Sequence, residues 1–86
     1  MSLKLQTDNA GNIITQPLTG YATRTVANLA GLLVLQYAPT PESLEIEEKR
    51  QQVQIVLSPQ QGLELARALT TLCELLLQNA EKSTRH

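Results

Sequence analysis

Apolar and polar residues alternate over residues 52–57 and then apolar residues recur every three or four positions over residues 63–80. The first period predicts a half-buried β-strand, and the second predicts an amphipathic α-helix. Between them stand Ser58, Pro59 and Gln61. A Ser N-cap, a Pro at the first helical position and an amide side chain three residues after the Ser favour a helix start. The last third of the chain therefore predicts a strand that passes directly into a helix laid on a sheet.

Strand-like segments also precede this corner. Residues 12–26 are rich in β-branched side chains, but Pro17 and Gly20 interrupt them, which predicts two short strand pieces with an irregularity between them. After a turn expected over residues 28–31, residues 32–38 are almost wholly apolar, which is typical of a central strand. These segments supply the strands needed to build a sheet.

The densest charge in the chain lies in residues 42–50, where acidic residues are followed by basic ones. This partial self-neutralisation is typical of a solvated hairpin loop, and a loop connection makes the flanking strands antiparallel. We therefore expect an α+β fold, with an antiparallel three- or four-stranded β-meander followed by one long C-terminal α-helix packed on the sheet. Residues 1–86 are expected to form a single domain, with residues 1–11 as an arm and residues 81–86 as a polar tail.

The predicted helix has one apolar face and three leucines beside it. At about 100° per residue, a stripe about 120° wide contains Leu65, Ala66, Leu69, Leu72, Cys73, Leu76 and Ala80. Leu63 and Leu77 lie on one flank of this stripe, and Leu75 lies on the other. Neighbouring loops could cover these three leucines, and scattered exposed leucines need no explanation. The alternative is a surface for self-association or for a partner protein, which the gain of about 1.5–3 kcal/mol per buried leucine favours.

Composition adds a second argument for self-association. Of the 86 residues, 42% are apolar but only 2% are aromatic, without Trp or Phe. Such a small aliphatic core gains stability when two copies pair. We expect a homodimer with Leu63, Leu75 or Leu77 at or near a two-fold contact. Pairing between edge strands is the competing geometry, and Pro17 disfavours it by removing a backbone donor.

Charge and cysteine content limit the classes of function. The net charge is −1 and the seven basic residues are spread along the chain, so no bulk attraction to nucleic acid or to an anionic membrane is expected. A single cysteine excludes an intrachain disulfide and fits a reducing compartment. Residues 1–9 lack the apolar run of a signal peptide, and the longest apolar run, residues 32–35, is too short to cross a membrane. These features predict a cytoplasmic protein.

Candidate catalytic and metal-binding residues are sparse. Cys73 lies on the apolar stripe, where a small buried hydrophobe is expected, and the single histidine is the last residue, His86. Glu45, Glu47 and Glu48 fall in the predicted surface loop, where no desolvation separates their pKa values. The four glycines stand apart, so no phosphate-binding loop is indicated. We expect no enzyme activity, no cofactor and no metal.

Tyr21 and Tyr37 are the only aromatic residues. Near strand ends they are natural anchors for a protein partner, because aromatic residues are enriched among interface hot spots. The alternative is that they cap the small core with their hydroxyls in water. An RNA-binding sheet normally carries more aromatic residues, and a second helix for a helix-turn-helix is missing. Nucleic-acid binding is therefore the weaker alternative. Its basis is that a dimer could bring Arg24 of each subunit onto one face.

Three elements of the chain together resemble one known family. Residues 16–21 read Gln-Pro-Leu-Thr-Gly-Tyr, residues 32–37 read Leu-Leu-Val-Leu-Gln-Tyr and precede Thr40-Pro41, and a strand then passes through Ser58 into the helix. In this order they are similar to the BssS family of small bacterial biofilm-formation regulators, which also occur in phages and prophages. The similarity covers residues 12–80, although Tyr21 stands where the family pattern has Trp and residues 42–51 differ in composition.

The BssS resemblance implies a small cytoplasmic regulatory protein that acts through protein–protein contacts, and it transfers no catalytic residues. We therefore expect a non-catalytic interaction protein, such as a phage or prophage modulator of a host protein. Its unidentified protein partner is expected to bind near Tyr21, Tyr37, Leu63, Leu75 and Leu77. The alternative is a small nucleic-acid-binding transcriptional or RNA regulator.

Overall fold

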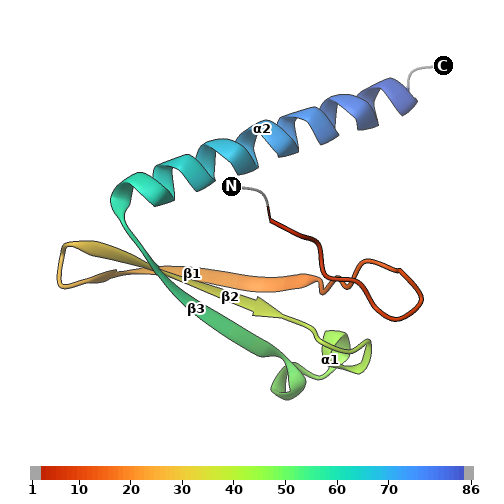
Figure 1. Cartoon of the computed structure of the whole chain (residues 1–86), viewed down its shortest axis with the longest axis horizontal. Coiled ribbons are helices and arrows are strands. Elements are labelled where there is room, and N and C mark those ends of the chain that lie inside the picture. Colours follow the sequence, from red (N-terminus) through yellow and green to blue (C-terminus); the bar gives the residue numbers. More distant parts are fainter. Residues whose placement is uncertain (1–2, 85–86) are drawn as a thin grey trace. The chain divides into compact units, whose positions relative to one another are not determined.

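Three strands and one long helix make up most of the regular structure in the computed structural model, which describes residues 3–84. The elements follow in the order β1 (Leu18–Val26), β2 (Ala30–Tyr37), α1 (Glu42–Glu45), the 3-10 turn η1 (Glu47–Lys49), β3 (Gln51–Leu57) and α2 (Pro59–Thr84) (Figure 1). The strands form one antiparallel sheet in the order β1-β2-β3. The expected α+β fold, a β-meander followed by one long C-terminal helix, is confirmed, and β2 is the central strand.

A tight turn joins β1 to β2. Ala27 and Asn28 both have positive φ angles, 52° and 57°, and the Leu29 N–H donates to the Val26 carbonyl at 3.0 Å. Two successive residues in the left-handed region match the right-handed twist of a hairpin. The turn is therefore centred on residues 27 and 28 and begins one residue before the expected range of 28–31. Asn28 favours this position because asparagine tolerates the left-handed conformation.

β1 begins directly after Pro17 and continues without a break. The prediction of two strand pieces within residues 12–26 is therefore wrong, and upstream of β1 an isolated bridge pairs Ile13 with Thr7. Pro17 has no N–H to donate, but its carbonyl accepts a 3.1 Å hydrogen bond from the Ala38 N–H. Proline thus stands at the entrance of the strand, where its missing donor removes no bond from the ladder.

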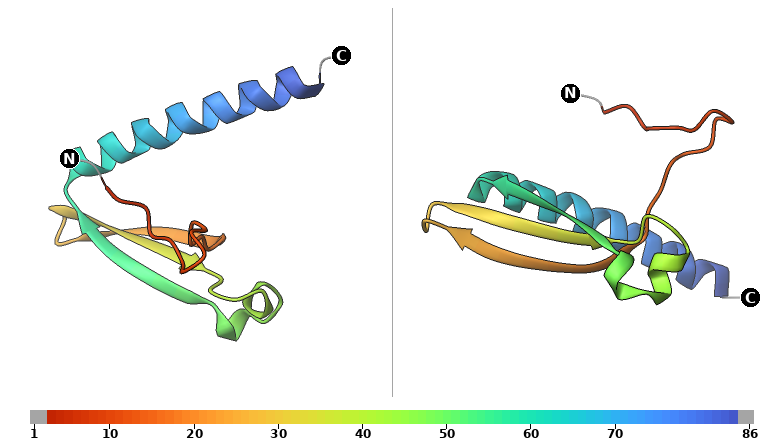
Figure 2. Two further views of the ribbon diagram at one scale, coloured as in Figure 1. Left: turned by 45° about the vertical axis from the view of Figure 1, so that its right-hand side comes forward. Right: turned by 90° about the horizontal axis from the view of Figure 1, so that it is seen from below.

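The charged segment between β2 and β3 joins antiparallel strands and is mostly exposed, as its composition predicts, but it is more regular than the expected loop. It forms two short helical turns, α1 and η1 (Figure 2). Ser43 is fully buried, and its hydroxyl donates to the Thr40 carbonyl at 2.5 Å. The Arg50 guanidinium donates to the carbonyl oxygens of Ser43 at 2.9 Å and of Leu44 at 2.7 Å. The charge pattern could not predict these turns, because most of the hydrogen bonds that hold them are accepted by backbone and hydroxyl oxygens and not by charged groups.

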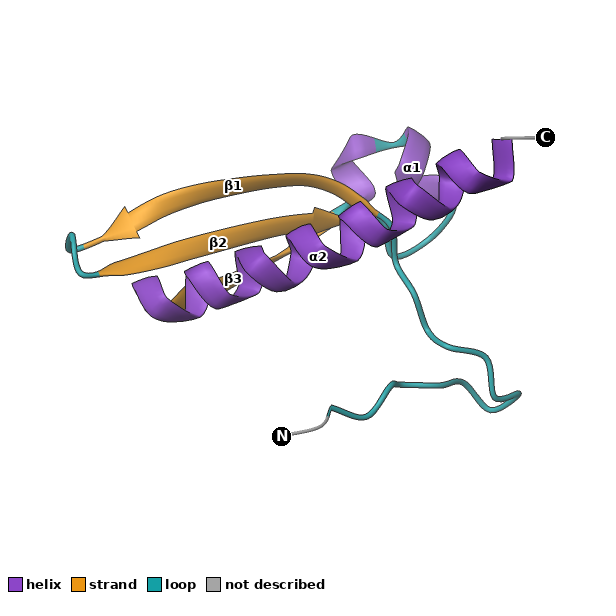
Figure 3. Ribbon diagram, turned by 90° about the horizontal axis from the view of Figure 1, so that it is seen from above, coloured by secondary structure: helices purple, strands orange, loops and turns teal. Residues whose placement is uncertain are grey.

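The corner between β3 and α2 has the hydrogen bonds that the sequence predicts. The Gln61 N–H donates to Ser58 Oγ at 3.1 Å, and the Ser58 N–H donates to Gln61 Oε1 at 3.0 Å, which is a reciprocal capping box. From this cap α2 continues as a single helix (Figure 3). It passes beyond Ala80, so residues 81–84 of the expected polar tail are helical, whereas residues 85–86 lie outside the described part of the chain.

The chain divides into two compact units. Of the described residues, the first unit contains 3–22 and 34–54, with α1 and η1, and the second contains 23–33 and 55–84, with the hairpin turn and α2. Within residues 3–82, only Ala38 and Ser43 are buried, and both belong to the first unit. The interior of the first unit is therefore centred on the segment that follows β2.

Leu57 fills the corner of the second unit. Its Cδ1 lies 3.1 Å from the position that a Cβ would take on Gly31 in β2. The same methyl carbon lies 3.1 Å from the corresponding position on Gly62 in the first turns of α2. Two glycines therefore leave the space that this one leucine occupies.

The leucines of the apolar stripe of α2 are partly exposed. Leu65, Leu69, Leu72 and Leu76 keep between 40% and 55% of their surface accessible. Cys73, expected to be a small buried hydrophobe, is exposed as well. Periodicity identified the apolar face correctly, but it carries no information about the layer that covers this face.

Candidate functional site

The two predicted aromatic anchors lie in the first unit and differ in how they are held. Tyr21, in β1, is 78% exposed. Tyr37, at the end of β2, is half-buried, and its hydroxyl donates to Gln51 Oε1 at 3.1 Å. This bond ties the end of the central strand to the start of β3. Of the two rings, Tyr21 is therefore the more available to a partner.

The three leucines predicted for a contact lie on α2 in the second unit, and all three are exposed. Leu63 and Leu77 share one flank of the helix, but the rise per residue separates them by about 21 Å. Leu75 lies on the other flank. The three leucines do not make a patch by themselves, and the more continuous apolar feature is the row of leucines between the two flanks.

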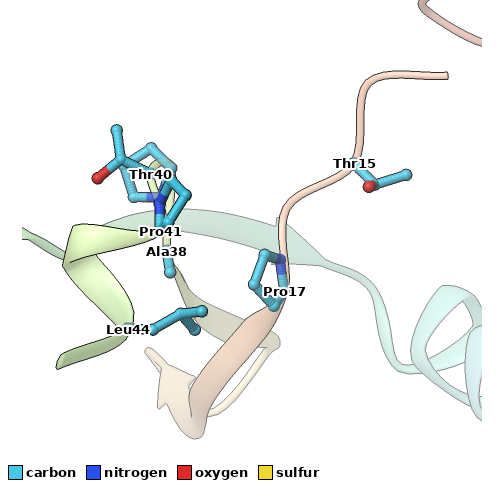
Figure 4. A pocket seen from close by; sticks show the side chains of 7 residues that line it. Thr15, Pro17, Ala38, Thr40, Pro41 and Leu44 are labelled. Carbon is cyan, nitrogen blue, oxygen red and sulfur yellow. The ribbon is translucent and has the colours of Figure 1, made fainter. Parts of the chain in front are cut away.

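A shallow pocket that sequence reasoning missed lies in the first unit (Figure 4). Its volume is about 200 Å³, and it is lined by Thr15, Pro17, Ala38, Pro39, Thr40, Pro41 and Leu44. The side chains of Pro17, Ala38 and Leu44 border a common space in the close view. Pockets for small-molecule ligands usually measure about 300–1,000 Å³, so this smaller pocket has room for one large apolar side chain.

Short-range hydrogen bonds hold the walls of this pocket. The bond from the Ala38 N–H to the Pro17 carbonyl joins the entrance of β1 to the segment after β2. Around the start of α1, the Thr40 N–H donates to Ser43 Oγ at 3.1 Å, and the Ser43 N–H donates to Thr40 Oγ1 at 3.3 Å. These reciprocal bonds orient the first turn of α1 and with it the side chain of Leu44.

The pocket brings together residues of two separate sequence motifs. Pro17, Thr40 and Pro41 all belong to the segments that carry the BssS resemblance, and all three line the pocket. The pairing of β1 with β2 makes them neighbours. The two motifs thus contained residues of the pocket, but no period or spacing along the chain predicted that these residues are neighbours in the structure.

Three charged groups of the first unit, those of Glu42, Lys49 and Asp8, make local contacts. Lys49 Nζ lies 2.6 Å from Glu42 Oε1. Asp8 Oδ1 accepts hydrogen bonds from the backbone N–H groups of Asn12 and Ala10, each at 2.9 Å. These bonds, with that from Asn12 the strongest influence, lower the pKa of the Asp8 carboxyl below its usual value. The carboxylate of Asp8 therefore closes the loop before Ile13.

Residues 3–84 contain no cluster of His, Cys, Asp and Glu that could hold a metal ion. His86 lies outside these residues. None of the described helices combines the length and the apolar content needed to cross a lipid bilayer.

These elements define a small α+β chain with a three-stranded antiparallel meander, a long C-terminal helix and exposed apolar surfaces. Comparison with protein-family models, with curated proteins and with solved structures finds no match. The residues of the chain itself therefore carry the functional inference.

Proposed function

We propose that the chain is a non-catalytic regulatory protein that acts by binding another protein. The pocket of the first unit carries this proposal, because its lining is mostly apolar and its volume suits one side chain. No charged residue lines it, so the complementary group is an aliphatic or aromatic side chain exposed on the partner.

The surface as a whole supports an interaction role. Among the described residues, twenty large apolar side chains are exposed and one apolar residue, Ala38, is buried. Extended exposed apolar surface on a soluble chain marks sites of contact with other molecules. The BssS resemblance favours the same role, that of a small cytoplasmic regulator from a bacterium or a phage.

Measured binding to a partner captured from a bacterial lysate tests this proposal. The captured protein is purified, and its dissociation constant for the chain is determined by titration calorimetry. Leu44→Asp places a charge at the pocket and should weaken binding at least tenfold, because an unpaired charge is costly to desolvate. Leu29→Asp makes the same change at an exposed leucine outside the pocket and should leave binding unchanged. Equal effects of the two substitutions would refute the pocket as the site.

Tyrosine substitutions test whether an aromatic anchor belongs to the same contact. Tyr21→Ala should weaken binding to the purified partner, and Tyr21→Phe should retain it, because the ring rather than the hydroxyl supplies the contact. Tyr37→Ala is the matched comparison at a ring whose hydroxyl is already bonded within the sheet. Unchanged affinity in both folded alanine variants would remove the two tyrosines from the site.

The competing function is that of a nucleic-acid-binding regulator. The salt dependence of binding distinguishes it from protein binding at the pocket. Phosphate contacts release counterions, so their affinity falls steeply with salt, whereas contact with an apolar pocket does not. Retention on heparin at moderate salt, reduced by Arg24→Ala, would overturn the protein-binding proposal. Passage through the column without retention would favour it.

A further inference from the structure

A row of exposed leucines runs along α2. At intervals of four, three and four residues it contains Leu65, Leu69, Leu72 and Leu76. This is the spacing of a coiled-coil seam, and the four residues fall within about 60° of the helix circumference. Arg67 and Glu74 lie on the opposite face. We call this row the seam; each of its members is at least two-fifths exposed in the single chain.

The seam reads the same in both directions along the helix. A two-fold axis that crosses it midway between Leu69 and Leu72 places Leu69 of one copy opposite Leu72 of the other, and Leu65 opposite Leu76. Every leucine of the seam then meets a leucine. Antiparallel helices also place the positive end of each macrodipole beside the negative end of the other. The seam is therefore complementary to itself, as an isologous contact requires.

The residues beside the seam fit the same arrangement. A two-fold axis perpendicular to the helices keeps identical flanks on one side of the pair, so the flank with Ala66, Cys73 and Ala80 meets its own copy. Small side chains on this flank allow the helices to approach closely. On the other flank, Leu75 of one copy lies about 3 Å along the axis from Ala68 of the other. A large residue beside a small one fills the space without a clash.

The exposed leucines of the seam give a second copy enough apolar surface to cover. Each of the four keeps between 40% and 55% of its surface accessible, so a pair of copies brings eight such side chains into one contact. Full burial of a leucine side chain stabilises by about 1.5–3 kcal/mol. A second copy carries the same row of leucines, and it is present wherever the protein itself is present.

We infer that two copies of this chain form a homodimer through the seam, with their α2 helices antiparallel. The inference goes beyond partner binding at the pocket and does not depend on it, because the pocket lies in the first unit and α2 in the second. It places the contact on the row between the flanks, with Leu75 at its edge and Leu63 and Leu77 outside it. The purified chain alone is enough to test it.

Light scattering and thermal melting of the purified chain test dimer formation. At micromolar concentration we expect twice the mass of one 9.5 kDa chain. The melting temperature should rise when the protein concentration is increased tenfold, because dissociation and unfolding are coupled. The mass of a single chain, or a melting temperature that does not change with concentration, would overturn the inference.

Two equivalent substitutions locate the contact on α2. Leu72→Asp places two charges at the centre of the seam and should raise the dimer dissociation constant at least 100-fold, or leave the chain unfolded where the wild type is folded. Leu77→Asp is the matched control, since it makes the same change at an exposed leucine outside the seam, and it should remain dimeric. A dimer that tolerates Leu72→Asp, or that is lost equally in both variants, would refute the seam.

Spin labels at two heights on α2 determine the direction of pairing. Arg67→Cys and Gln78→Cys, each combined with Cys73→Ser, place single labels on the face away from the seam. At 1.5 Å rise per residue, an antiparallel pair separates the labels along the axis by about 10 Å at position 67 and about 22 Å at position 78. A parallel pair in register gives no axial separation at either position. A clearly longer distance at position 78 is expected, and equal distances would refute the antiparallel arrangement.

Discussion

Leu57 makes a contact in the second unit that one added methyl group should disturb. A Cβ on Gly31 would lie 3.1 Å from Leu57 Cδ1. Carbon atoms in optimal contact are about 3.5–4.0 Å apart, so Gly31→Ala must displace the tip of the leucine by roughly 0.4–0.9 Å. The matched control is Gly20→Ala in β1, where the nearest atom is Gln36 Oε1 at 3.4 Å, an ordinary contact.

The two substitutions should therefore have opposite signs. Replacing a strand glycine by alanine stabilises by about 0.5–1 kcal/mol, because the unfolded chain loses conformational freedom. At Gly20 nothing close opposes this gain. At Gly31 the overpacking costs about 1–3 kcal/mol, which leaves a net loss of up to about 2.5 kcal/mol. With Leu57→Ala the obstructing methyl is gone, and Gly31→Ala should become stabilising.

Urea melts followed by circular dichroism give the four free energies of the double-mutant cycle between positions 31 and 57. All variants are measured at one protein concentration, so that any association contributes equally. We expect a coupling free energy of at least about 1 kcal/mol, since the two side chains compete for the same space. A stabilising Gly31→Ala in the wild-type background, or an equal loss in Gly20→Ala, would refute this packing argument.

Three local features of the chain give further predictions. Ser58→Ala removes the hydroxyl that accepts the Gln61 N–H and should lower the free energy of unfolding by about 0.5–2 kcal/mol in urea melts; an unchanged value would show that the cap contributes nothing. Ala27→Asn relieves a residue held at a φ of 52° and should raise the melting temperature, because asparagine adopts the left-handed conformation more readily than alanine; an unchanged or lower melting temperature would contradict this. Because the pKa of Asp8 is lowered, its bonds stabilise the folded loop above the ordinary pKa and are lost as the pH falls through the folded value. The amide proton shift of Asn12 should follow this titration by NMR and lose it in Asp8→Ala.

The sequence predicted the elements whose determinants are local. The capping box at Ser58 and Gln61 needs only residues three positions apart, and both of its hydrogen bonds are present. The alternation in β3 and the period in α2 likewise depend on neighbours along the chain. The turn after β1 was placed late because Ala27 gives no signal for a positive φ, and only Asn28 does.

The sequence failed where distant groups decide the structure. The folded state of residues 42–50 depends on Arg50, whose guanidinium reaches back to the carbonyl oxygens of Ser43 and Leu44. In the composition this arginine is one basic residue among several, so its contacts with distant carbonyl groups could not be predicted. The pocket was missed for a similar reason, since Pro17 and Thr40 become neighbours only when β1 pairs with β2.

The two proposed contacts together imply a bivalent protein. If the seam joins two copies, each dimer carries two pockets, one from the first unit of each copy. A partner that presents two side chains within reach is then held about 10²- to 10⁴-fold more tightly than a partner that presents one, without any additional contact at either pocket. If the Leu72→Asp monomer remains folded by circular dichroism, it should bind an immobilised, crowded partner more weakly while its affinity for the soluble single-site partner is unchanged. Leu44→Asp should lower both, so the seam and the pocket make separable contributions to one function.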